Sequence, residues 1–255
     1  MFRIRSDWTF HAVNDKISYG EYLRVFRGGF MKILLIADEE SKILWDYFDP
    51  ERLEGVELIL SAGDLKSSYL EFLVTMLNIP LLYIHGNHDS HYERKPPNGC
   101  ICIEDKIYNF NGLKILGLGG SVRYRKGPHM YTEMEMKVRC IRADFQATLR
   151  NGFDILLTHA PARGWGDLDD YPHRGFDCFN PLLEKWNPKY MVHGHVHQAY
   201  GHFQRERTHS CGTTIINACD YVILDIPTGA YPKPGKTGSP LYDLHIAMQR
   251  RKNHQ

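Results

Sequence analysis

The chain has 255 residues, of which 43% are hydrophobic and 24% charged, enough to bury the core of one large domain. Its 31 basic and 30 acidic residues leave a formal charge of +1, without the basic excess that is typical of a general nucleic-acid binder. The sequence has no apolar run long enough to cross a membrane and no apolar segment of a secretory signal. We therefore expect a cytoplasmic protein with no membrane partner.

The first half of the predicted domain alternates apolar runs with helical patterns. Residues 32–37, 56–61 and 80–84 have the composition of strands buried on both faces. Residues 41–48 and 67–77 have apolar side chains at helical spacing. Strands that alternate with short helices predict βαβ units and a parallel sheet.

The second half has a different pattern. Asn111-Gly112 separates residues 106–110 from 113–118, which predicts a β-hairpin. A long helix is expected over 132–150, and further strands over 153–158, 189–193, 213–217 and 220–226. We expect residues 31–227 to form the domain, residues 1–30 an N-terminal extension, and residues 228–255, with three prolines and a basic end, a peripheral tail.

Polar side chains follow five of the predicted strands directly. They lie in Asp38-Glu39-Glu40, Gly63-Asp64, Gly86-Asn87-His88-Asp89, Thr158-His159 and Gly194-His195-Val196-His197. In open α/β sheets, ligands bind at the carboxyl ends of the strands, so we expect these segments to converge on one site. Carboxylate, imidazole and amide oxygen together suit Mn, Fe, Zn or Mg, and two ions ~4 Å apart require a bridging ligand such as a carboxylate. The residues therefore predict a dinuclear metal centre.

The six cysteines are scattered and form no CxxC pair. This distribution is typical of reduced thiols in a cytoplasmic protein.

The order of these motifs resembles the calcineurin-like metallophosphoesterase superfamily, whose signature is D-x-H, GD, GNH-D/E, H and GHxH. The resemblance spans residues 32 to about 226. It implies an α/β fold, a four-layer α-β-β-α sandwich of mixed sheets flanked by helices. It also implies an enzyme that hydrolyses a phosphate monoester or diester, so the expected partner is a small phosphorylated substrate or a phosphodiester.

The resemblance also implies a role for each matching metal ligand. Asp64 would bridge two divalent ions, for which Mn²⁺ is favoured and Fe, Mg²⁺ and Zn²⁺ are alternatives. Asp38 and His197 would bind the first ion. The second ion would be bound by Asn87, His159 and His195.

The same resemblance implies the catalytic roles of two further residues. A metal-bound hydroxide would attack phosphorus, and His88 would protonate the leaving oxygen as general acid. Asp89 would hold the His88 ring in the required tautomer.

Glu40 departs from the family pattern, which has histidine at this position. A carboxylate there could ligate the first metal and favour harder ions over Zn²⁺, since Asp38 and Glu40 share a face of an extended segment. The alternative is that Glu40 turns aside at the start of a surface helix.

Residues of the nearby loops are candidates for substrate contact. Arginine forks suit phosphate oxygens, and each of these residues could equally be an ordinary surface side chain. The candidates are Arg163, His173, Arg174 and, in the segment after the 113–118 strand, Arg123.

Two other functions remain open for this sequence. One is a catalytically weak metal-binding scaffold on the same fold, as in retromer's scaffold subunit; the intact His88 and second-metal set favour an enzyme, and Glu40 points the other way. The other is a nuclease of the same superfamily, which the neutral charge disfavours.

Overall fold

The computed structural model describes residues 30–200 and 203–227. The expected N-terminal extension, apart from Phe30, and the expected tail over 228–255 lie outside the described residues.

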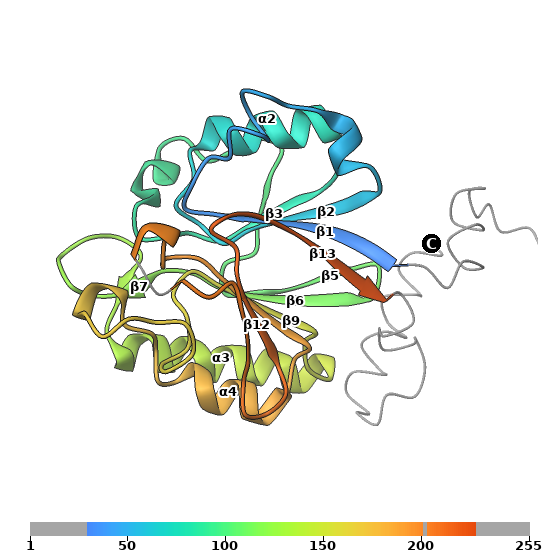
Figure 1. The fold of residues 1–255 in the computed structure, drawn as a ribbon. Coiled ribbons are helices and arrows are strands. Elements are labelled where there is room, and N and C mark those ends of the chain that lie inside the picture. Colours follow the sequence, from blue (N-terminus) through green and yellow to red (C-terminus); the bar gives the residue numbers. More distant parts are fainter. Residues whose placement is uncertain (1–29, 201–202, 228–255) are drawn as a thin grey trace, which may run out of the picture.

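Two β-sheets lie face to face, and helices cover their outer faces (Figure 1). The five-stranded sheet has the order β13 (Asp220–Pro227), β1 (Phe30–Ala37), β2 (Val56–Ser61), β3 (Leu81–Tyr83) and β4 (Ile101–Cys102). The six-stranded sheet has the order β11 (Glu206–Thr208), β12 (Thr214–Asn217), β10 (Tyr190–His193), β9 (Ile155–Thr158), β6 (Leu113–Leu118) and β5 (Ile107–Phe110). A small third sheet pairs β7 (Ser121–Val122) with β8 (Met130–Tyr131).

Helix α2 (Ser67–Leu77) lies on the outer face of the five-stranded sheet, and α3 (Glu133–Arg150) and α4 (Phe179–Trp186) lie on that of the six-stranded sheet (Figure 1). Short 3₁₀ helices occupy Pro50–Leu53, Asp89–Glu93, Tyr171–His173 and Gln198–Tyr200. In the part of the chain that the structure describes, no helix has the length and apolar character needed to span a membrane.

The apolar run of β1 is divided between two cores. Ile33 and Leu35 belong to the core between the two sheets, whereas Leu34 and Ile36 belong to the core beneath α2. This alternation is the reason that the run is continuously apolar, because both faces of the strand are covered. A third core joins the six-stranded sheet to α3 and α4. Three cores between four layers confirm the predicted α-β-β-α sandwich of mixed sheets.

The strand directions place the polar loops at one end of the sandwich. β1, β2 and β3 run parallel in one sheet, and β9 and β10 run parallel in the other. β13 pairs antiparallel with β1, and the hairpin predicted at Asn111-Gly112 joins β5 and β6, with both turn residues at positive φ. The five motif segments each follow one of the parallel strands, so they begin at the carboxyl ends of those strands.

The helix expected over 41–48 is wrong, because these residues form turns. Leu44 is buried nonetheless, and Trp45 and Phe48 are half-buried, with their rings 4.8 and 5.4 Å from the Phe72 ring of α2. Helical spacing here reflects packing against α2 and not a helical backbone. Helix α4 was not predicted, since it is only 8 residues long and contains Pro181.

Candidate metal centre

Three of the predicted ligands, within three residues of a strand end, have the left-handed backbone conformation that residues other than glycine rarely adopt. Asp38, Asp64 and His195 have φ values of 63°, 58° and 69°. Each such residue costs about 1–3 kcal/mol, and this strain persists only where the surrounding structure enforces it. Strain of this kind gathered at three strand ends is typical of a functional site.

Glycines allow these loops to approach each other closely. A Cβ atom on Gly86 would lie 2.0 Å from Asp64 Oδ1, and one on Gly194 would lie 2.7 Å from Asp38 Oδ2. A Cβ atom on Gly63 would lie 2.3 Å from the amide nitrogen of Gly86. The glycine of each motif therefore makes room for a carboxylate or for the neighbouring loop.

His159 joins four of the strand ends. Its Nδ1 lies 2.8 Å from the carbonyl oxygen of Ala62 and 4.0 Å from Asp38 Oδ1. Its Nε2 lies 3.0 Å from Asn87 Oδ1 and 3.3 Å from Asp64 Oδ2. One ligand atom each from Asp38, Asp64 and His159 lie within 4.8 Å of one another. Predicted ligands that are far apart in sequence thus meet in one buried cluster.

The two histidines of the last motif have different neighbours. The His195 amide donates to both Oδ atoms of Asp38 at 3.0 and 2.9 Å, and its ring lies 4.9 Å from the His159 ring. His195 Nε2 lies 2.8 Å from the carbonyl oxygen of Pro172. His197 Nδ1 lies 3.4 Å from Glu39 Oε1.

The electrostatics of the cluster fit a cation site. Burial raises the pKa of Asp38 to about 6, although the charge of His159 acts to lower it. The nearby Asp64 adds to the rise. Burial would also raise the pKa of Asp64, but His159 and the amide of His88 lower it. Burial would lower the pKa of His159, yet Asp64 and Asp38 raise it to about 9, so one imidazole offsets two carboxylates. Burial and His159 lower the pKa of His195 to about 3, which leaves a neutral ring of the kind that ligates metals. Two carboxylates, an amide oxygen and neutral imidazole nitrogen form a donor set that suits divalent cations.

A cavity of about 430 Å³ opens beside the cluster. It is lined by Asp38, Glu40, Asp64, Leu65, Lys66, His88, Asp89 and His91. His88 is exposed, and its amide donates to Asp64 Oδ1 at 2.7 Å. Its φ of −103° and ψ of 0° lie in the sparsely populated bridge region, where many active-site residues are found. His88 therefore lines the same cavity as Asp38, Asp64 and Asp89.

Asp89 has partners that differ from those the resemblance implies. Its Oδ2 accepts from the amide of Asp64 at 2.8 Å and from the amide of Gly86 at 2.7 Å. Asp89 is 1% exposed. The carboxylate therefore ties the loop after β2 to the loop after β3, and in the structure it supports Asp64 and not the ring of His88.

Glu40 lines the cavity but is paired with a cation of the chain. Its Oε2 lies 3.2 Å from Lys66 Nζ. The carboxylate that meets His197 is Glu39. The expectation that Asp38 and Glu40 share a face assumed an extended backbone, and the left-handed conformation of Asp38 breaks that alternation.

The four candidate substrate residues have different surroundings. Arg163 pairs with Asp167 at 2.7 Å, and Arg123 pairs with Glu135 at 2.7 Å, so both cations have structural partners. Arg174 is exposed. The ring of His173 lies 5.3 Å from the ring of His195, which makes it the candidate placed against a predicted ligand.

A network behind the site was not visible in the sequence. Glu104 accepts from the amide and Nδ1 of His85, both at 3.1 Å, and from the amide of Gly119 at 2.7 Å, and it pairs with Arg139. Burial would raise the pKa of Glu104, but His85 and Arg139 lower it to about 2. The network fixes the residue that precedes the Gly86-Asn87-His88 loop.

Two further residues near the site were missed. Tyr124, which follows the candidate Arg123, accepts from Asn87 Nδ2 at 3.4 Å. Cys219 is fully buried beside Glu39 and His197. Burial raises the pKa of its thiol to about 12, and Asp38 and Glu39 add to the rise. Cys219 belongs to no motif, so only the fold brings it to this place.

Comparisons with known proteins agree with this fold. Residues 31–199 match the family model described as calcineurin-like phosphoesterase. The UPF0046 protein C25E10.12 of Caenorhabditis elegans is 31% identical over 165 residues, which cover 55% of this chain and 50% of that protein. The chain thus spans about half the length of this relative.

More distant relatives cover more of the chain. Metallophosphoesterase domain-containing protein 1 of Homo sapiens is 21% identical over 257 residues, which cover 78% of this chain and 72% of that protein. The structure of TT1561 of Thermus thermophilus has a TM-score of 0.51 at 16% identity and covers 77% of this chain and 94% of that chain, which shows a shared fold. Since the family model covers most of the described sandwich and every motif loop, this chain belongs to the calcineurin-like phosphoesterase family.

Proposed function

We propose that this chain hydrolyses a phosphate monoester or diester at a centre of two divalent metal ions. The observation that carries the proposal is the meeting of Asp38, Asp64, Asn87 and His159 in one buried cluster beside the His88 cavity. The family is metal-dependent, and its reaction class matches the residue types in the cluster.

The proposed ligand sets are those that the family resemblance implies. Asp64 is the proposed bridge, because its Oδ2 faces His159 while its Oδ1 is held by the amide of His88. Asp38 and His197 would hold one ion. Asn87, His159 and His195 would hold the other, and the oxygen donors of this centre suit Mn²⁺, with Fe, Mg²⁺ and Zn²⁺ as ions to compare. When bound, the two ions supply an activated water and offset the charge of the phosphate.

The chain's own residues complete the reaction. His88, at the cavity edge, is proposed to donate a proton to the leaving oxygen, a step that contributes roughly 10²–10⁴-fold in rate. Asp89 holds the Asp64 and Gly86 amides and so fixes the loops that carry the bridge and His88. His173, beside His195, is proposed to contact the substrate. All six cysteines are free, which supports the proposed cytoplasmic location.

The test is His88→Ala, assayed with an aryl phosphate monoester and the matching diester. We expect kcat to fall by roughly 10²–10⁴-fold while the metal content of the protein is unchanged. His91→Ala is the matched control, because His91 lines the same cavity and has no proposed role.

Unchanged turnover in His88→Ala would refute the proposed role of this residue. A wild-type protein that binds two ions but hydrolyses neither ester would point to the scaffold function. Turnover of nucleic acid alone would point to the nuclease.

A further inference from the structure

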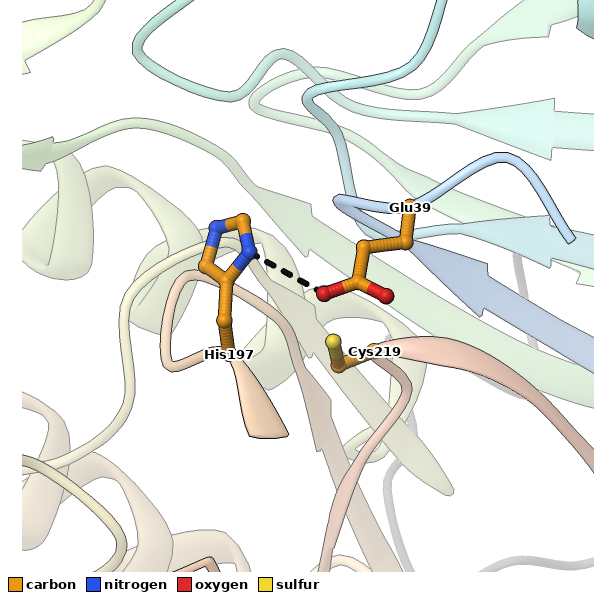
Figure 2. Close-up of side chains that lie close together, drawn as sticks. All are labelled: Glu39, His197 and Cys219. Carbon is orange, nitrogen blue, oxygen red and sulfur yellow. Dashed lines mark ion pairs between the residues drawn. The ribbon is translucent and has the colours of Figure 1, made fainter. Parts of the chain in front are cut away.

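Three side chains outside the proposed bridging cluster meet next to it (Figure 2). Glu39 follows β1, His197 follows β10, and Cys219 lies between β12 and β13. One ligand atom from each lies within 4.8 Å of the other two, and His197 Nδ1 is 3.4 Å from Glu39 Oε1. Figure 2 shows the sulfur directed toward the space between the carboxylate and the ring. A carboxylate oxygen, an imidazole nitrogen and a sulfur therefore converge from three loops.

The backbone around Cys219 and His197 is held firmly by one asparagine. Asn217 Oδ1 accepts from the amide of Cys219 at 2.8 Å, and Asn217 Nδ2 donates to the carbonyl oxygen of Val196 at 2.8 Å. Asn217 thus ties the loop of Cys219 to the residue before His197. Cys219 also forms a β-bridge with Ala37, two residues before Glu39. The meeting of the three side chains is therefore a product of the fold.

The two neighbouring glutamates have different partners. Glu40 is neutralised by Lys66 Nζ at 3.2 Å. Glu39 instead pairs with the imidazole of His197, a group that itself ligates metals when neutral. The Glu39 side chain is 48% exposed, so it is free to close by the roughly 1 Å needed to bring ligand atoms about 3.5 Å apart around a tetrahedral ion.

We propose that Glu39, His197 and Cys219 together bind the first metal ion of the centre, with a thiolate sulfur as one ligand and a preference for Zn²⁺ or Co²⁺ over Mg²⁺ and Mn²⁺. This inference rests on the proposed function in that it takes His197 as a metal ligand. Zn²⁺ takes cysteine sulfur, histidine nitrogen and carboxylate oxygen as ligands, and Asp38 and the bridging Asp64 would complete its coordination. Sulfur is a soft donor, and it selects Zn²⁺ and similar ions over hard ions. On coordination, the thiol proton would pass to solvent.

Cobalt substitution tests the proposal without any measurement of turnover. The full-length chain, stripped of metal, is titrated with Co²⁺ while its absorption spectrum is recorded. A thiolate bound to Co²⁺ gives an intense charge-transfer band in the near ultraviolet, which oxygen and nitrogen ligands do not give. We expect this band in the wild type and its loss in Cys219→Ser.

The controls use matched neighbours. Cys211→Ser should keep the band, although Cys211 Sγ lies 3.0 Å from His209 Nδ1 and is another cysteine beside a histidine. Glu39→Gln should weaken Co²⁺ binding at this position by at least about tenfold, since even the loss of an outer partner of a metal ligand costs that much. Glu40→Gln should weaken it less than Glu39→Gln does. Because Glu39 is exposed, this pair remains informative if Cys219→Ser is unstable.

A wild-type spectrum without the charge-transfer band overturns the proposal. So does a band that survives Cys219→Ser or disappears in Cys211→Ser, and so does a larger loss of affinity in Glu40→Gln than in Glu39→Gln. Failure of the proposed function is a separate result: a protein with the band and no phosphoester turnover keeps the thiolate site and loses the enzyme. A protein with turnover and no band does the reverse.

Discussion

Gly86 lies where the loop after β3 meets the Asp64 carboxylate, so Gly86→Ala is a steric test of the whole centre. A Cβ atom there would lie 2.0 Å from Asp64 Oδ1 and 2.5 Å from Asp64 Cγ. Ordinary van der Waals contact begins at 3.4 Å, so the overlap with Oδ1 exceeds 1 Å. It would also lie 2.6 Å from the Asp64 amide nitrogen, so movement of the side chain alone does not relieve the overlap. The two loops therefore have to separate, and the carboxylate moves with them by about 1 Å.

The size of the effect follows from what Asp64 would lose. A shifted carboxylate gives up the hydrogen bond from the His88 amide at 2.7 Å and the contact with His159 Nε2 at 3.3 Å. Overpacking costs about 1–3 kcal/mol, and loss of a hydrogen bond to a charged group costs about 1.5–3 kcal/mol, so we expect a loss of roughly 3–5 kcal/mol in the free energy of unfolding. A displacement of ~1 Å at a catalytic site also lowers the rate by about 10²-fold.

The assay combines urea unfolding, metal content and hydrolysis of an aryl phosphate. Gly127→Ala is the control, because the nearest atom to its Cβ would be Met130 Cε at 3.4 Å, at the end of a flexible side chain. We expect the control to resemble the wild type in all three measurements. If Gly86→Ala kept wild-type metal content and turnover within about twofold, the close approach of this loop to Asp64 would be unimportant and the reasoning refuted.

Three further changes test other parts of the structure. Glu104→Gln should destabilise the protein by about 3 kcal/mol at neutral pH, because the pKa of Glu104 in the folded state, about 2, lies below the ordinary 4.5. This contribution to stability is present above pH 4.5 and is lost as the pH falls through 2. The unfolding free energies of metal-free wild type and variant should therefore converge in acid, and a difference that stays constant with pH would contradict the assignment. Thr132→Ala removes the cap of α3, whose hydroxyl accepts from the Glu135 amide at 3.2 Å, and should cost about 1 kcal/mol, or 2–4 °C in Tm; an unchanged Tm would show that the cap is dispensable. His173→Ala should raise KM by roughly threefold to tenfold with kcat unchanged, and a fall in kcat alone would place His173 in the chemistry instead.

Local hydrophobic patterns were sufficient to predict the elements whose burial follows a regular repeat. The continuous apolar run of β1 reflects burial on both faces, and the structure divides it between two cores. Helix α2 has the predicted bounds, Ser67–Leu77, and ends at Asn78 in the left-handed conformation. In both elements the spacing of the buried side chains matches the repeat of the backbone, so the sequence alone predicts the secondary structure.

Elements defined by distant partners could not be predicted in this way. The side chains of residues 41–48 are spaced as in a helix because they pack on α2, and nothing local reveals that their backbone turns. Strand β11 has 3 residues and exists through pairing with β12. Short elements of this kind depend on tertiary contacts more than on propensity.

The site likewise has features that the sequence predicts and features that it does not. That these loops meet follows from the parallel direction of the strands before them, which the sequence predicts. The contacts of each side chain in a loop do not: after the left-handed turn at Asp38, Glu39 meets His197 while Glu40 lines the cavity beside Lys66, and Cys219 is placed by the pairing of its strand region with Ala37. A single backbone torsion at a strained position has no signature in residue spacing.

Metal-dependent phosphoester hydrolysis by this chain is tested most directly by a metal titration of the stripped protein. Aryl phosphate hydrolysis and bound metal would be measured together as Mn²⁺ or Zn²⁺ is added and then removed with a chelator. We predict no turnover without metal, turnover that rises as two ions bind, and loss of turnover on chelation. Turnover that persists after complete removal of metal, or two bound ions with no hydrolysis of any phosphoester, would contradict the proposed function.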